Sequence, residues 1–183
     1  MNKKLFALSI PIVLAPYLAL FTLATIFFST KLPFFRWIME VVFHGNAWYL
    51  IAALLIFCVV VVVWAGVISF VSVHKKWDAL AVAKTAMIVK LAQIPAYVAI
   101  FALGVVLILG IFTIPFALGL FVLDCLFVFM TGLLVISAVV ITIRNDHFTF
   151  SDLWWVLLLQ FVFCGDVIAA ILLYRKLRGI YGN

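Results

Sequence analysis

Five long apolar runs, each of 20 or more residues, dominate this chain of 183 residues. A helical run of about 20 apolar residues matches the roughly 30 Å hydrocarbon core of a bilayer. Backbone N–H and C=O groups in lipid must be paired within the protein, so only helices or a closed barrel can cross. The runs do not alternate apolar and polar residues as barrel strands do. The pattern therefore predicts an all-α fold, a polytopic transmembrane helical bundle that forms one domain over residues 1–183.

The composition excludes a water-soluble domain. Hydrophobic residues make up 70% of the chain and charged residues 10%, whereas soluble domains have about 45–50% and about 25%. The net charge of +6 is typical of basic loops on the cytoplasmic side of a membrane protein. The expected partner is therefore the lipid bilayer and not nucleic acid. The three cysteines, Cys58, Cys125 and Cys164, lie inside apolar runs without a CxxC spacing, so we expect no metal and no other cofactor.

The runs predict five transmembrane helices and one short interfacial helix. The expected spans are about 5–30, 47–73, 87–111, 116–143 and 153–174. Pro11 and Pro16 should kink the first span or confine regular helix to its later part. The connector from Pro33 to Phe43 places polar residues at every fourth position, which predicts an amphipathic helix lying along the bilayer surface. The polar positions of that connector are Arg36, Glu40 and His44.

Lysine and arginine residues in short loops predict a cytoplasmic N-terminus. With five crossings, seven basic residues lie on the cytoplasmic side and five on the other. If the last run does not cross, the ratio becomes ten to two, which is a clearer bias. The length of the last run and its flanking aromatic residues favour a complete crossing. We therefore expect five crossings, with a charge distribution that fits four better.

Two acidic residues lie inside expected spans, Asp124 in the fourth and Asp166 in the fifth. A carboxylate in the bilayer centre costs roughly 3 kcal/mol on insertion scales, so both should face protein or water. Lys90 is expected to extend from the start of the third span toward the interface, which leaves no basic partner at the depth of the acids. Gln160 is a third polar residue in this region. These residues form a candidate intramembrane polar or ion site.

Short loops at 110–115 and 144–152 should place the third, fourth and fifth spans side by side. The two carboxylates would then lie at similar depth and could approach each other. The alternative is that each acid is protonated or bonded to a neighbouring helix and serves only as a packing contact. Ala65 and Ser69 form a small-xxx-small pair that predicts close approach of another helix.

Three functions are compatible with this pattern. A non-enzymatic role is favoured, either as a small cation- or proton-linked transporter or as an accessory subunit of a membrane complex; a homo-oligomer is also possible. An intramembrane protease is the alternative, because Gly165-Asp166 and Asp124 are faintly similar to the paired aspartates of intramembrane aspartyl proteases. Those enzymes carry Gly-x-Gly-Asp and Tyr-Asp, and here Phe163 and Leu123 replace the first Gly and the Tyr.

Two sequence stretches carry a resemblance to a known family. They are KLAQIPAY at Lys90–Tyr97 and LQFVFCGDV at Leu159–Val167, followed by the basic ending from Tyr174 to Lys176. They resemble an uncharacterised family of small multi-spanning membrane proteins from clostridia-like Gram-positive bacteria. The resemblance implies the plasma membrane of a bacterium, and it implies no activity and no site residues.

Overall fold

The structure, a computed structural model, consists of helices and their connections and contains no strand in the part of the chain that it describes. Its nine helical elements are α1 (Lys3–Leu8), α2 (Ile10–Phe28), α3 (Pro33–Trp37), η1 (Ile38–Val42), α4 (Ala47–His74), α5 (Ala79–Ile108), α6 (Ile114–Arg144), α7 (Phe150–Leu159) and α8 (Gly165–Tyr181). The residues described are 3–110, 113–145, 148–160, 162 and 165–181. The expected all-α helical bundle is confirmed.

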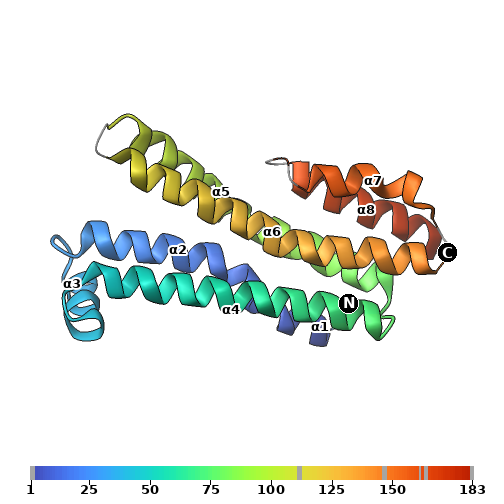
Figure 1. Cartoon of the computed structure of the whole chain (residues 1–183), viewed down its shortest axis with the longest axis horizontal. Helices are drawn as coiled ribbons and strands as arrows, with labels where there is room; N and C mark the ends of the chain where they lie inside the picture. The colour runs from blue at the N-terminus through green and yellow to red at the C-terminus, as the bar shows by residue number, and fades with distance from the viewer. Residues whose placement is uncertain (1–2, 111–112, 146–147, 161, 163–164, 182–183) are drawn as a thin grey trace.

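Four long helices run along the length of the molecule and pack side by side (Figure 1). The apolar segments that could cross a membrane contain 25, 28, 30 and 31 residues and lie in α1–α2, α4, α5 and α6. At 1.5 Å per residue each exceeds the roughly 30 Å of a hydrocarbon core. Many large apolar side chains on their outer faces are exposed, as expected for a surface that faces lipid. The chain is a multi-pass integral membrane protein.

The expected fifth span, 153–174, is not a single helix, and this prediction was wrong. The segment forms α7 and α8, which are separated by residues 160–164. Figure 1 shows the two helices as an antiparallel hairpin whose outer ends lie at the same end of the bundle. With 10 residues, α7 is roughly 15 Å long and too short to cross. α8 has 17 residues, the second half of which carries Arg175, Lys176 and Arg178, so its apolar part is also too short. The break lets Asp166 stand at the start of a helix and reach a basic partner on α5, which one straight helix would not allow.

The start of the third span also differs from the expectation. α5 begins at Ala79, eight residues before the expected 87, because Asp78 caps it by accepting hydrogen bonds from the N–H groups of Leu80 and Ala81. Gln93 and Pro95 therefore lie in the middle of α5 rather than in its first turns. The other boundaries differ less, and the first helix is interrupted at Ser9, ahead of Pro11.

The connector between α2 and α4 is helical, as predicted, over 33–42. Its first turn is α-helical and the remainder is a π-helix. The Phe35 ring lies tilted against those of Phe21 and Phe28, with ring centroids 5.9 and 6.2 Å apart, so the connector folds back on the end of α2. Arg36 and Glu40 are exposed. Their contact with water at a bilayer surface stays a prediction.

Small residues allow the long helices to pack closely. Ala65 is wholly buried and Ser69 is 9% exposed, and α4 packs against α2 and α6. At the far end of α5, the Thr113 hydroxyl donates to the carbonyls of Leu107 and Gly110. A Cβ at Gly110 would lie 2.7 Å from Thr113 Oγ1, so a side chain there would force the Thr113 hydroxyl to move.

Basic residues gather at one end of the bundle. The α4–α5 connection, the end of α6 and both outer ends of the hairpin lie there, and the α2–α4 and α5–α6 connections lie at the opposite end (Figure 1). Because α7–α8 returns to its starting end, the tail joins the other basic segments. Of the basic residues, Lys75 and Lys76 belong to the α4–α5 connection, Arg144 to the end of α6, and Arg175, Lys176 and Arg178 to the later part of α8. Lys31 and Arg36 belong to the α2–α4 connection.

Candidate functional site

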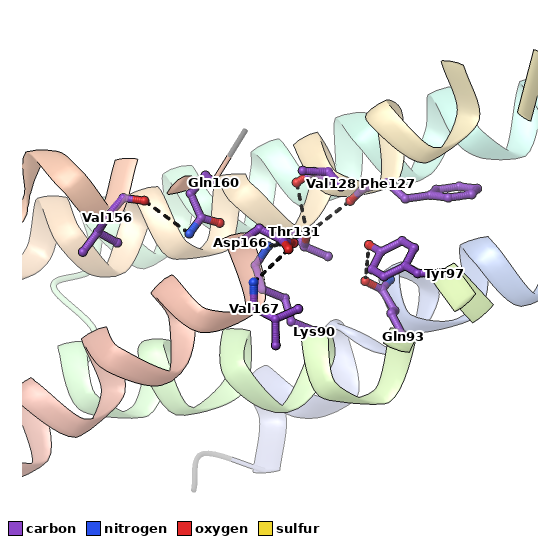
Figure 2. A network of polar contacts seen from close by, with 10 residues as sticks. All are labelled: Lys90, Gln93, Tyr97, Phe127, Val128, Thr131, Val156, Gln160, Asp166 and Val167. Atoms are coloured by element: carbon purple, nitrogen blue, oxygen red, sulfur yellow. Dashed lines mark hydrogen bonds and ion pairs between the residues drawn. The ribbon is translucent and has the colours of Figure 1, made fainter. Parts of the chain in front are cut away.

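A buried ion pair joins α5 to α8. Lys90 Nζ lies 2.7 Å from Asp166 Oδ2, and the two side chains are 0% and 3% exposed. Lys90 Nζ also donates to Thr131 Oγ1 on α6 at 3.0 Å. Figure 2 shows the three side chains converging from three helices. This is the one salt bridge within the described residues.

The position of Asp166 follows from the helix break. It occupies the first turn of α8, where N–H groups are free of intrahelical partners and the helix dipole favours a negative charge. Asp166 Oδ1 accepts a hydrogen bond from the N–H of Val167 at 2.8 Å. Gly165 lets α8 begin close to the end of α7, because an added Cβ would lie 3.1 Å from Val162 Cβ and 3.2 Å from the Leu159 carbonyl.

The expectation that Lys90 extends to the interface was wrong. Its side chain is fully buried and points to α8, because α8 packs mainly against α5 and supplies the carboxylate with which Lys90 pairs. Sequence reasoning therefore missed the basic residue of the site. A signal was present, since Lys90, Gln93 and Tyr97 are spaced at i, i+3 and i+7, which places three polar side chains on one face of a helix.

Next to the ion pair, a second polar contact involves α2, which carries Pro16 in its interior. Pro16 lacks an N–H, so the carbonyl of Ile12 has no intrahelical partner. Gln93 Nε2 on α5 donates to that carbonyl at 2.6 Å, and the Tyr97 hydroxyl donates to Gln93 Oε1 at 2.9 Å. Both side chains are buried, and they hold α2 against α5 one helical turn beyond Lys90 (Figure 2).

Gln160, one of the three candidate residues, stands at the end of α7. Its Nε2 donates to the Val156 carbonyl at 3.4 Å, and its Oε1 is buried without a hydrogen-bond partner. A Cβ on Gly132 would lie 3.9 Å from Gln160 Oε1, so Gln160 rests against α6. It borders the ion pair (Figure 2) without a hydrogen bond to it.

Two cavities lie end to end along the seam between α5 and α6. The first, about 290 Å³, is lined by Asp166 and by apolar and aromatic side chains of α5, α6 and α8. The second, about 150 Å³, is lined by Asp124 together with residues of α5 and α6. Phe101 borders both cavities. Each of the two sequence-predicted acids thus has a cavity of its own.

The carboxylates of Asp124 and Asp166 are not joined to each other by a hydrogen bond. Asp166 is held by Lys90 and by the backbone, and Asp124 Oδ1 is buried without a partner. The two acids still interact electrostatically. In an aspartic protease the two carboxylates share one proton, and the pairing of Asp166 with Lys90 leaves no such dyad. The ion pair with Thr131 therefore forms the site, and Asp124 lies beside it.

The described residues contain no group of three or more His, Cys, Asp or Glu side chains that could hold a metal ion. Cys58 is buried and Cys125 exposed, and Cys164 lies outside the described residues.

Comparison with known proteins gives no match: no family model, no curated protein and no solved structure matches the chain.

Proposed function

We propose that the chain is a small cation- or proton-linked membrane transporter whose coupling element is the Lys90–Asp166 ion pair. One observation carries this proposal: a fully buried ammonium–carboxylate pair at the tip of a helical hairpin, bordering a cavity. Ionisable side chains within a membrane domain mark ion pathways and proton relays. Interrupted helices whose ends meet inside the bundle are a recurring way to build a transport site.

The energetics of the pair support a functional role over a purely structural one. Removing two charges from water costs several kcal/mol per ion, and a buried pair is often no more stabilising than an apolar pair of similar volume. Fold stability alone thus gives no reason for a charged pair at this depth. A pair that exchanges its partners, in contrast, needs both charges.

The location of the pair supports movement as well. Lys90 and Thr131 belong to the long-helix bundle and Asp166 belongs to the hairpin. The pair therefore crosses the contact between two parts of the molecule. Rocking of one part of a transporter against another around a fixed site is the common mode of alternating access, and such rocking would open and close this pair.

An accessory subunit is less well supported. That role would be favoured by a small-residue groove left open for a partner, such as the face of Ala65 and Ser69. Both residues are buried within the chain itself, so this face is already occupied. The protease alternative lacks the dyad it needs, since Asp166 is bonded to Lys90.

For location, we propose the plasma membrane of a bacterium with the basic end of the bundle in the cytoplasm. The clustering of basic residues at one end supports this orientation. A single cysteine at position 76 should be labelled by an impermeant thiol reagent only after the cells are opened. Labelling in intact cells would contradict the orientation.

The transport proposal is tested with the purified full-length protein in liposomes that contain the pH indicator pyranine. Inward gradients of Na⁺, K⁺, choline and tetraethylammonium are imposed in turn. At least one gradient should drive proton movement out of the liposomes, and Asp166→Asn should abolish this movement. The matched control is Asp124→Asn, the same substitution beside the pair, which should retain it.

Protein-containing and protein-free liposomes that respond identically to all four cations would contradict transport. Proton movement that survives Asp166→Asn in a folded protein would separate transport from the ion pair. Folding of each variant is checked by gel filtration in detergent before reconstitution.

A further inference from the structure

We propose that the cavity of about 290 Å³ beside Asp166 binds a lipophilic organic cation, which takes the place of the Lys90 ammonium on the Asp166 carboxylate and releases one proton. The proposal deepens the transport function above, on which its role in transport rests. It names the substrate class and the exchange stoichiometry of the same site.

The lining of the cavity selects the kind of ligand. Besides Asp166 it consists of one tyrosine and apolar side chains: Ile94, Tyr97, Val98, Phe101, Val128, Val167 and Ile168. A bare metal ion needs several oxygen ligands, six or more for calcium or magnesium. This wall offers a single carboxylate and a phenol. An organic ammonium needs only one negative charge, and its apolar body is satisfied by the rest of the wall.

The size of the cavity points the same way. A volume of about 290 Å³ is many times the roughly 30 Å³ that one water molecule occupies. It approaches the lower limit, about 300 Å³, of pockets that hold drug-sized ligands. Aromatic rings of Tyr97 and Phe101 on the wall can face a cation, an attractive arrangement.

The mouth of the cavity lies on the outer surface of the helices. Val98, Phe101 and Ile168 line it and are 62%, 59% and 55% exposed. These side chains belong to the apolar surface that faces lipid in a membrane-spanning bundle. Entry from the hydrocarbon side is open to a lipophilic cation and closed to a hydrated metal ion, because the latter would have to lose its water in lipid.

The native ion pair already shows that Asp166 accepts an ammonium group. In the resting state Lys90 donates to it at 2.7 Å and the pair is neutral as a whole. When a permanent cation binds to Asp166, the site keeps its neutrality if Lys90 loses one proton to the solvent. One N–H bond of the Lys90 ammonium breaks, its hydrogen bond with Asp166 is replaced by the contact with the organic cation, and no other covalent bond changes. Thr131 Oγ1, which lies 3.0 Å from Lys90 Nζ in this structure, remains a hydrogen-bond partner for the resulting amine.

The neighbouring titratable groups are few. Tyr97 on α5 and Asp124 on α6 both interact electrostatically with Asp166. Of the remaining elements that pack on the pair, α7 contributes Gln160 and α2 contributes the Ile12 carbonyl held by Gln93, and neither titrates. Substitution of Asp124 therefore tests whether that group, and not Lys90, supplies the released proton.

The probe is benzyltrimethylammonium, a permanent cation with an aromatic body, and its neutral control is neopentylbenzene, which has the same shape. Binding to the purified full-length protein in detergent is measured by calorimetry in buffers of different ionisation enthalpy. The expected result is binding of the cation with release of about one proton, so that affinity rises about tenfold per pH unit. The neutral isostere should bind at least tenfold more weakly.

Four variants test whether the cation binds at Asp166 and within this cavity. Asp166→Asn should lose the binding of the cation, whereas Asp124→Asn should keep both binding and proton release. Val98→Trp should fill the cavity and block binding without touching the ion pair. Its matched control is Val105→Trp, two turns further along α5 and lining the second cavity, which should bind as the wild type does.

Equal binding of the cation and the neutral isostere would overturn the proposal, as would cation binding without proton release. Unchanged binding in folded Asp166→Asn or in Val98→Trp would also overturn it. Failure here is distinct from failure of transport. Proton movement driven by Na⁺ or K⁺ together with absent binding of the organic cation would reject this inference alone, and binding without any flux would reject the transport function alone.

Discussion

Two interruptions of helical hydrogen bonding in this molecule are compensated by side chains of the same helix, α5, in different ways. In α2, Pro16 frees the carbonyl of Ile12, and Gln93 of α5 donates to it. α7 ends at Leu159 and a separate helix, α8, begins at Gly165, where Lys90 of α5 binds Asp166 in its first turn. The two side chains lie three residues apart on one face of α5 and reach in different directions (Figure 2).

The difference is one of charge. A neutral amide meets a neutral carbonyl at the proline, which satisfies a backbone group at modest cost and holds α2 in place. A cation meets an anion at the hairpin tip, where desolvation of both groups is expensive. The first interruption is explained by folding alone, since bilayer proteins must pair every backbone group. The second is not explained by folding energetics alone, and the proposed exchange of partners at Asp166 would require both charges.

The largest expected effect breaks the charged contact. Asp166→Leu alone should lower the free energy of unfolding by about 3–5 kcal/mol, because it leaves Lys90 buried without a partner. The double variant Lys90→Met, Asp166→Leu should recover most of this loss. Unfolding in mixed micelles of rising SDS content measures both. Equal destabilisation by the single and double variants would show that the pair is not coupled.

The neutral contact should respond more weakly. Gln93→Leu should cost about 1–3 kcal/mol, because the Ile12 carbonyl loses its donor. In a Pro16→Ala background the new N–H can bond that carbonyl within α2, so Gln93→Leu should cost less than half as much. The same SDS titration on the four proteins gives the coupling free energy. Identical costs in the two backgrounds would contradict the role assigned to Gln93.

A third experiment tests the close approach of α7 and α8. Gly165→Ala introduces a Cβ 3.1–3.2 Å from atoms of Val162 and Leu159, and overpacking of this kind costs about 1–3 kcal/mol. Gly179→Ala in the same helix meets nothing within 4 Å and should be neutral or stabilise slightly. Melting temperatures of the two variants in detergent should move in opposite directions, or Gly165 alone should change. A greater loss with Gly179→Ala would contradict this assignment.

The smallest expected effect is at the start of the hairpin. Hydrogen bonds from the hydroxyl and the N–H of Thr149 hold the pKa of the exposed Asp152 below its ordinary value of 3.8. A depressed pKa means that the carboxylate stabilises the folded state above pH 3.8 and that this contribution is lost as the pH falls through the lower folded value. Thr149→Val should reduce the acid sensitivity of the melting temperature between pH 5 and about pH 3. An unchanged pH profile would contradict the capping role.

Much of the fold could be predicted from residue type and spacing. Long apolar runs in lipid have only a helical solution, so the four long helices and the helical connector from Pro33 were predictable. The capping residue Asp78 was present in the sequence, but the apolar pattern after it is interrupted by Lys84 and Lys90. This is why the beginning of α5 was placed too late.

The site was predicted only in part. Polar groups in apolar runs must face protein or water. This rule indicates Asp124, Asp166 and Gln160 from the sequence alone. Lys90 was excluded, since a lysine near the end of a span normally reaches water. Its burial depends on α8 packing against α5, a contact between residues 76 positions apart that no local pattern specifies.

The sequence by itself determined that this chain crosses a membrane as helices, because hydropathy and backbone pairing act on each segment separately. Only the tertiary structure decided that the last apolar run folds into a hairpin. Length and hydropathy are the same for a straight helix and a broken one. The choice between a straight and a broken helix depends on partners from other helices. Here Asp166 pairs with Lys90 of α5, and this pairing requires α8 to begin inside the bundle.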